Sequence, residues 1–161
     1  MKRLWITLIS ILALTGCAGY SPSSKLIGKD RWFLISEMGT PEREYWSSDL
    51  QVLHYPRGPG GSHTYFVYLD KNDVVVKWDQ VLTEAQFDKI RAGMPEHEVI
   101  NLLGITKMTH QIARDRGYVW HYRYQTFACK SFVIEFTSEN TVRSAGYLTR
   151  TGRKCKYVGI G

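Results

Sequence analysis

The spacing of apolar and polar residues in the middle of the chain predicts two short helices. Thr83 and Gln86 fit a capping box, in which each side chain hydrogen-bonds the other residue's backbone N–H. The first helix would end at Gly93, because glycine readily takes the left-handed conformation at a helix C-terminus. Pro95 suits the first turn of a second helix, which carries an apolar stripe and ends at Gly104. The segment therefore predicts a helix–turn–helix corner.

The alternation of apolar and polar residues after this corner predicts strands. Residues 118–124 are rich in aromatic side chains, and residues 132–137 alternate with the period of two that a half-buried strand requires. Ser138, Glu139 and Asn140 form a turn before a third strand at residues 142–148. A fourth strand would fit in the region 104–117. We expect the two helices to cover one face of this antiparallel sheet.

The first half of the chain has the same order of features as the second half. Gly28 and Gly39 are spaced like Gly93 and Gly104, and residues 50–56 and 65–76 match residues 117–123 and 132–143. This order indicates an internal duplication of about 66 residues, although two small α+β halves could also agree by chance. The predicted fold class is α+β: a tandem repeat of helix–turn–helix packed on a three- to four-stranded antiparallel sheet. The predicted units are residues 25–81 and 82–149.

The N-terminus has the pattern of a secretory signal. Lys2 and Arg3 precede an apolar run that ends at Leu14, which is shorter than the roughly 20 residues of a membrane-spanning helix. The sequence Leu14-Thr15-Gly16-Cys17 resembles the lipobox of bacterial lipoproteins. The resemblance implies cleavage after residue 16 and lipid, such as palmitate, at Cys17. The alternative is an ordinary signal peptide with a chance cysteine.

The cellular location implied by this resemblance is the periplasmic side of the outer membrane. Ala18, rather than aspartate, follows the cysteine, and in enterobacteria-like sorting this implies the outer membrane. Residues 1–16 would be the signal peptide and residues 17–24 a lipidated tether. The chain would be held by its N-terminal lipid, since several acyl chains on one cysteine hold more firmly than one.

The net charge of +6 falls to +4 once Lys2 and Arg3 are removed with the signal. These charges are scattered except in the basic C-terminal tail, residues 150–161, so no nucleic-acid footprint is predicted. The tail suits lipid headgroups or an acidic partner, and a solvated tail is the alternative. Cys129 and Cys155 form an even pair in an oxidising compartment, which predicts a disulfide; two buried free thiols are the alternative.

Motifs of catalysis and metal binding are missing from the sequence. The five histidines lack the spacing of HExxH, and no CxxC motif is present, so no metal is predicted. A nucleophile elbow for Ser-His-Asp chemistry is also missing. The glycine-rich stretch 58–61 is expected to be a hairpin loop without phosphate-binding function. We therefore expect no enzyme activity, no cofactor and no small-molecule substrate.

The aromatic content of 13% exceeds what small helical layers need for a core. Tyrosine and tryptophan suit protein interfaces, because they bury a large area and keep a polar tip. The alternative is that most of these rings lie in the core. The partner-binding residues predicted on this basis are Tyr55, Tyr68, Trp78, Trp120, Tyr122 and Tyr124.

The lipobox together with Gly93-Met94-Pro95, Glu98-Val99 and Leu103-Gly104 resembles the SmpA/OmlA (BamE-like) family of outer-membrane lipoproteins. Thr106 departs from the proline that family members often have at this point. The tandem arrangement resembles the β-lactamase inhibitory protein. These resemblances imply a protein that binds or scaffolds other envelope proteins, in outer-membrane protein assembly or envelope integrity. The alternative is a proteinaceous inhibitor of a periplasmic enzyme.

Overall fold

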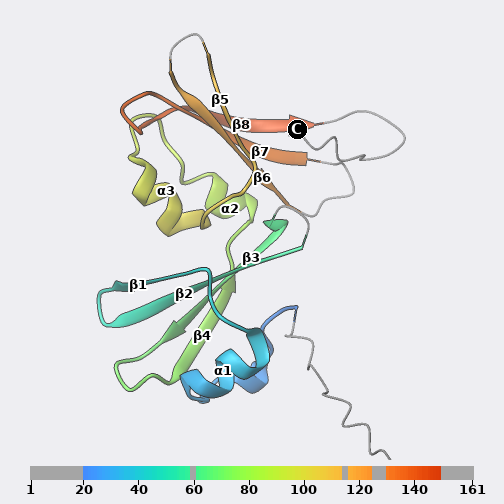
Figure 1. The fold of residues 1–161 in the computed structure, drawn as a ribbon, viewed down its shortest axis with the longest axis vertical. Coiled ribbons are helices and arrows are strands. Elements are labelled where there is room, and N and C mark those ends of the chain that lie inside the picture. The colour runs from blue at the N-terminus through green and yellow to red at the C-terminus, as the bar shows by residue number, and fades with distance from the viewer. Residues whose placement is uncertain (1–19, 59–60, 114–115, 125–129, 150–161) are drawn as a thin grey trace, which may run out of the picture.

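Two antiparallel sheets of four strands make up most of the structure (Figure 1). The computed structural model describes residues 20–58, 61–113, 116–124 and 130–149. In both sheets the strands lie in sequence order. The first sheet consists of β1 (Arg43–Ser47), β2 (Leu50–Arg57), β3 (His63–Leu69) and β4 (Val75–Gln80). The second consists of β5 (Thr109–Gln111), β6 (Tyr118–Arg123), β7 (Lys130–Phe136) and β8 (Val142–Thr149).

The helices of the described chain are short. A 3₁₀ turn, η1 (Ser24–Leu26), precedes α1 (Arg31–Met38), and α2 (Glu84–Phe87) and α3 (Glu96–Leu103) lie between the two sheets in sequence. None of them is long and apolar enough to cross a membrane. Short helices gain little from their own hydrogen bonds, so their stability must come from packing against the sheets.

The layers follow from the alternation of side chains along the strands. Leu53 and Val67 face α1 and pack with Leu34 in one core cluster. Their neighbours Val52 and Phe66 point to the opposite face and join a larger cluster around α2 and α3. Helix α1, the first sheet, the helices α2 and α3 and the second sheet therefore form successive layers (Figure 1).

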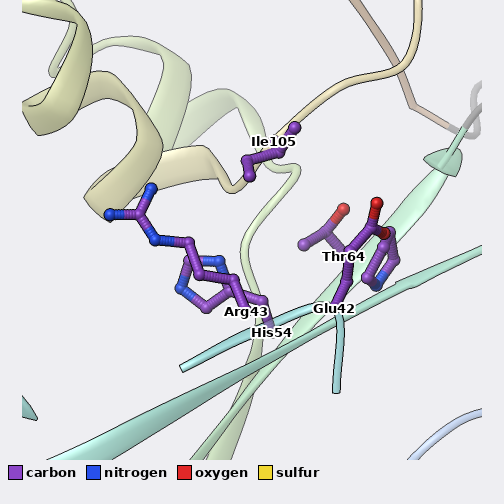
Figure 2. A pocket seen from close by; sticks show the side chains of 6 residues that line it. Glu42, Arg43, His54, Thr64 and Ile105 are labelled. Atoms are coloured by element: carbon purple, nitrogen blue, oxygen red, sulfur yellow. The ribbon is translucent and has the colours of Figure 1, made fainter. Parts of the chain in front are cut away.

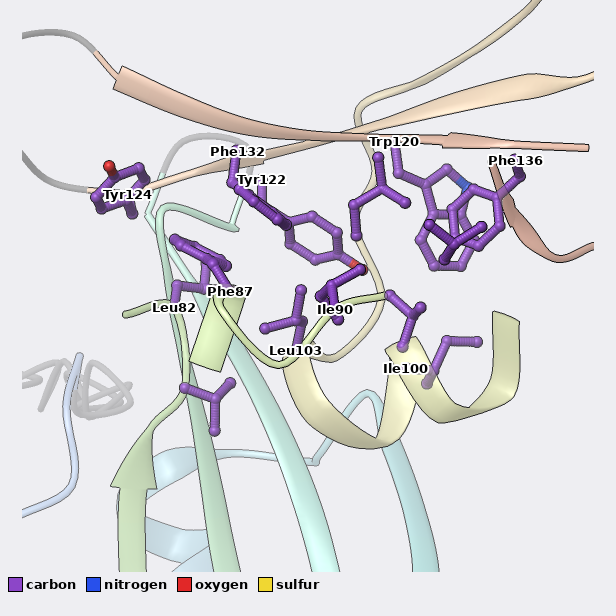
Figure 3. Packing of buried hydrophobic residues seen from close by; sticks show 14 of the residues in the cluster. Leu82, Phe87, Ile90, Ile100, Leu103, Trp120, Tyr122, Tyr124, Phe132 and Phe136 are labelled. Atoms are coloured by element: carbon purple, nitrogen blue, oxygen red, sulfur yellow. The ribbon is translucent and has the colours of Figure 1, made fainter. Parts of the chain in front are cut away.

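The second sheet covers α2 and α3 from the other side. Figure 3 shows aromatic side chains of β6 and β7 above the apolar side chains of the helical layer. Phe87 of α2 stacks on Phe132 with ring centroids 4.5 Å apart. Leu103 of α3 is fully buried in the same cluster as Ile134 of β7. This cluster joins the two halves of the described chain into one packed body.

The predicted fold class is wrong, because the described chain is mostly β and does not repeat a helix–turn–helix on each sheet. Helix α2 begins at the Thr83 cap as expected, but it ends after one turn at Phe87. The backbone N–H of Gly93 donates to the Val142 carbonyl at 2.8 Å, and the Val142 N–H donates to the Met94 carbonyl at 2.8 Å. The segment that was expected to turn between two helices is therefore bonded to the start of β8.

The first half differs from the prediction in the same way. Within residues 20–58, helix α1 is preceded by the three-residue turn η1 and not by a second α-helix. The N–H of Gly28 donates to the Val75 carbonyl at 2.8 Å, which bonds this glycine to a strand rather than ending a helix. The described chain is mostly β, with helices that fill the space between and beside the sheets.

Several predicted features lie outside the described residues. They are the signal peptide of residues 1–16, the lipid-bearing Cys17, the pair Cys129 and Cys155, and the tail of residues 150–161. The predicted unit boundary falls between Val81 and Leu82, which are both buried.

Candidate functional site

A shallow depression lies where the first sheet meets the chain that leaves α3. It has an empty volume of about 190 Å³, part of which is open to solvent. Figure 2 shows its walls, which come from β2, β3, the segment before and at the start of β1, and the residue after Gly104. The lining residues are Glu42, Arg43, His54, Pro56, Thr64 and Ile105.

His54 forms the floor of this depression and is only 2% exposed. Its ring stacks on Phe66 with centroids 3.8 Å apart and planes at 6°, and Tyr45 meets it edge-on at 5.2 Å. Neither ring nitrogen has a hydrogen-bond partner in the described part of the chain. Burial, together with the smaller effect of the positive charge of Arg43, lowers the pKa of His54 to about 4. The imidazole is therefore neutral at neutral pH.

The end of α3 is packed against this ring. A Cβ added at Gly104 would stand 3.8 Å from Nδ1 of His54 and 3.0 Å from the Thr64 methyl group. The hydroxyl of Tyr45 donates to the carbonyl of Asn101 in α3 at 3.4 Å. His54 is thus part of the contact between the first sheet and the helical layer.

The polar groups around His54 do not form a catalytic arrangement in the described chain. The Glu42 carboxylate pairs with Lys107 at 3.2 Å, and the Arg43 guanidinium lies over the Tyr45 ring at 5.8 Å. Within the described ranges no carboxylate is bonded to His54, as a general base would require for its orientation. The same ranges contain no group of three histidine, cysteine or acidic residues that could hold a metal ion. The contacts that the structure shows for His54 are ring-packing contacts with Phe66 and Tyr45.

Four of the six predicted partner-binding residues lie in the core. Tyr55 is buried beneath α1, while Trp120, Tyr122 and Tyr124 pack between the second sheet and the helical layer. The Tyr122 hydroxyl donates to the Gly104 carbonyl at 2.8 Å. Tyr68 and Trp78 of the first sheet are half-buried. The binding role of these residues stays a prediction, and in this structure the four buried rings pack inside the fold.

The most exposed aromatic side chains are two tryptophans that the sequence reasoning did not select. Trp32 of α1 is 77% exposed and Trp46 of β1 is 58% exposed. The buried residues of α1 are Leu34 and Met38, one turn apart, and Trp32 lies roughly 200° around the helix from Leu34. This helical periodicity is the signal that could have identified Trp32 as a surface residue.

Both tryptophans lie beside one charged network. Arg31, next to Trp32, contacts Glu44 at 2.9 Å and Asp73 at 3.1 Å, and it also bonds to Gln51. Glu44 and Trp46 share a face of β1, because side chains two residues apart on a strand point the same way. The exposed Trp32 is thus the sequence neighbour of Arg31, and the exposed Trp46 shares its strand face with Glu44, the ion-pair partner of Arg31 on the α1 side of the first sheet. We call Trp32, Trp46 and Arg31 with its acidic partners the α1-side surface.

Comparisons with known proteins give little similarity. No family model matches the chain, and no curated protein matches it. An extracellular protein containing an SCP domain from Bacillus anthracis is similar in structure, with a TM-score of 0.34, 11% identity, and coverage of 92% of this chain and 49% of that chain. A cysteine-rich secretory protein from Staphylococcus aureus has a TM-score of 0.30 and 13% identity, over 83% of this chain and 48% of that chain. The chain spans about half the length of these structures, and at these scores neither assigns its fold or function.

The interpretation as a member of the SmpA/OmlA family in a tandem-repeat arrangement is wrong. The described fold is two four-stranded antiparallel sheets with few helices instead of a BamE-like helix–sheet repeat. The glycine and proline motif that suggested the family is bonded to the start of β8 and leads into α3, of which Pro95 is the N-cap. A motif of this length specifies a local turn and does not specify a family.

Proposed function

We propose that the chain is a protein-binding or scaffolding module, held by lipid at Cys17 on the periplasmic side of the outer membrane. The observation that carries the proposal is the pair of exposed indoles on the α1-side surface. Tryptophan is strongly buried on average in folded proteins, and it is enriched among the residues that dominate protein interfaces. Two such side chains on one face support a binding role.

The charges around the indoles support the same role. Protein interfaces combine an apolar centre with a polar rim, and arginine is enriched in them. Arg31 is held in place by Glu44 and Asp73, so its planar group would lose little freedom when a partner binds. The partner is another envelope protein, in outer-membrane protein assembly or envelope integrity. The alternative of an enzyme inhibitor depended on the tandem resemblance, and no contact in the structure favours it.

The test is site-specific crosslinking in living cells. A benzophenone amino acid replaces Trp32 or Trp46, and ultraviolet light then captures any protein within reach. We expect both positions to capture the same envelope protein, and Trp46→Ala to reduce capture from position 32. The matched control is the same amino acid at Ile105, which is also exposed but belongs to the depression on the other face of the first sheet.

Two further results bear on the proposal. The Cys17→Ser variant should leave the membrane fraction and lose most of its captured partner, since the lipid places the chain near that partner. Equal capture at Ile105, or no adduct at either tryptophan position, would show that the α1-side surface is not a binding surface. Circular dichroism of each variant checks that the fold is retained, as expected for exposed positions.

A further inference from the structure

Strand β8 is the longest edge strand in the described structure. Its eight residues pair with β7 along one side, from Lys130 opposite Thr149 to Phe136 opposite Val142. No strand of the described ranges lies along its other side, and since Val142 is bonded there to Gly93 and Met94, the open stretch is residues 143–149. An edge strand presents a row of unpaired backbone N–H and C=O groups, which can pair with another extended chain.

The other three edges are protected in ways that β8 is not. β1 has five residues and carries Arg43 and Glu44, and β5 has only three residues. β4 carries Lys77 and Asp79, which form an ion pair at 3.3 Å. In β8, residues 144–149 read Ser-Ala-Gly-Tyr-Leu-Thr, with no charge and no proline. Charges, proline and short length are the usual protection of an edge against pairing, so β8 is open to it.

The same strand exposes two large apolar side chains. Tyr147 is 44% exposed and Leu148 is 45% exposed, and they lie on opposite faces of the sheet. Tyr147 is held on the core side by Phe132, at 5.2 Å between centroids, and by Asp88, which accepts from its hydroxyl at 3.5 Å. A strand added at this edge would cover part of both side chains.

We propose that β8 pairs antiparallel with β8 of a second copy of this chain, forming one continuous eight-stranded sheet. A two-fold axis through Gly146 places Tyr147 opposite Ala145 of the partner subunit and Leu148 opposite Ser144 of the partner subunit. On each face a large side chain then meets a small one, which is the size pattern that fits cross-strand neighbours. This self-complementarity favours a second copy over an unrelated strand.

The charges at the ends of the strand are compatible with this pairing. Arg143 would lie opposite Thr149 of the partner subunit, so the two Arg143 side chains stand at opposite ends, roughly 20 Å apart. Arg143 is also bonded to Glu135 at 2.7 Å. Within residues 143–149 the arrangement therefore brings no like charges together. An interface with two-fold symmetry uses the same surface on both subunits, as this one does.

The test uses a charge pair at the symmetry axis. Gly146 has open space around it, and a Cβ there meets no atom within 4 Å, so a side chain is tolerated in the single subunit. Gly146→Lys and Gly146→Glu each place two like charges directly opposite one another across the axis, which destabilises the pair. We expect the full-length wild-type chain to sediment as a dimer in excess detergent micelles and each variant to sediment as a monomer.

Mixing the two variants should restore a dimer that contains one copy of each, because lysine then faces glutamate. A folding defect would not be repaired by mixing. The matched control is Val76→Lys on β4, which is also an exposed edge position and should leave the dimer intact. A monomeric wild type, variants that remain dimeric, or a strand of another protein bound at β8 would each overturn the proposal.

Discussion

A buried imidazole without a hydrogen bond makes the fold sensitive to acid. His54 lies between Phe66 and Tyr45, and its charged form would have no hydrogen-bond acceptor within the described structure. The positive charge of Arg43 repels a second positive charge on His54, and the carboxylate of Glu42 forms an ion pair with Lys107. The neutral ring is therefore favoured by the folded state and the protonated ring by the unfolded state.

This preference predicts a loss of stability at low pH. The pKa of His54 is about 4 in the fold against 6.5 for the free group, so its contribution is present above pH 6.5 and is lost as the pH falls toward 4. Between pH 7 and pH 4.5 the free energy of unfolding should fall by about 2 kcal/mol from this group alone. Urea unfolding of wild type and His54→Phe measures it. The variant keeps the stacked ring and should lose less stability over the same range; parallel pH curves would contradict the assignment.

Gly93 and Gly104 have nearly the same positive φ, so substitutions at these two positions distinguish the cost of backbone strain from the cost of overpacking. Gly104 has φ 80° and Gly93 has φ 81°, a region that residues with a side chain rarely adopt. At Gly104 a Cβ would also press on Thr64 at 3.0 Å and on Phe66 at 3.4 Å, whereas at Gly93 nothing lies within 4 Å. Gly93→Ala should cost about 1 kcal/mol of unfolding free energy from strain alone. Gly104→Ala should cost more, by roughly a further 1–3 kcal/mol for the overpacked contact. Equal losses in urea unfolding would show that the neighbours of Gly104 move aside easily.

The sequence pattern predicted the strands of the second sheet better than it predicted the helices. The hydrophobic pattern predicted the positions of β6, β7 and β8 well, because alternation with a period of two is a local property of each strand. It predicted α2 to be far too long. Ile90 is buried although it lies outside any helix, so an apolar residue at helical spacing was mistaken for helical structure. β1 was missed because it is short and carries two charges.

Helix α1 offers a direct test of how much a cap contributes to an eight-residue helix. The Asp30 carboxylate accepts from the N–H of Phe33 at 2.8 Å. Asp30→Ala removes this bond and should lower the unfolding free energy by about 1 kcal/mol. Asp30→Asn keeps an acceptor in the same place and should lower it by less than half as much. Thermal unfolding of both variants measures the difference, and an equal loss would mean that the charge rather than the acceptor matters.

The arrangement of the two sheets around one helical layer could not be predicted from the sequence. It depends on contacts between residues far apart in the chain, such as Phe66 of the first sheet with the cluster that includes Leu103 and Ile134. No local pattern specifies these contacts. For the same reason the sequence could not separate core tyrosines from surface tryptophans: Tyr122 is buried against the helical layer, while Trp46 is exposed on the edge strand β1.

Because both sheets pack against the same helical layer, we expect a destabilising substitution in the first sheet to affect the second sheet as well. Phe66 points toward α3, and Leu34 lies in the separate cluster between α1 and the first sheet. Phe66→Ala should cost about 3–5 kcal/mol of unfolding free energy, and Leu34→Ala should cost about 2–5 kcal/mol. Amide hydrogen exchange reports where this loss appears, because protection follows local opening. Phe66→Ala should speed exchange in β6 and β7 as well as in β2 and β3, whereas Leu34→Ala should act mainly on α1 and the first sheet. If both variants left β6 and β7 protected to the same degree, the two sheets would be independent, and the helical layer would be a spacer between two separate cores.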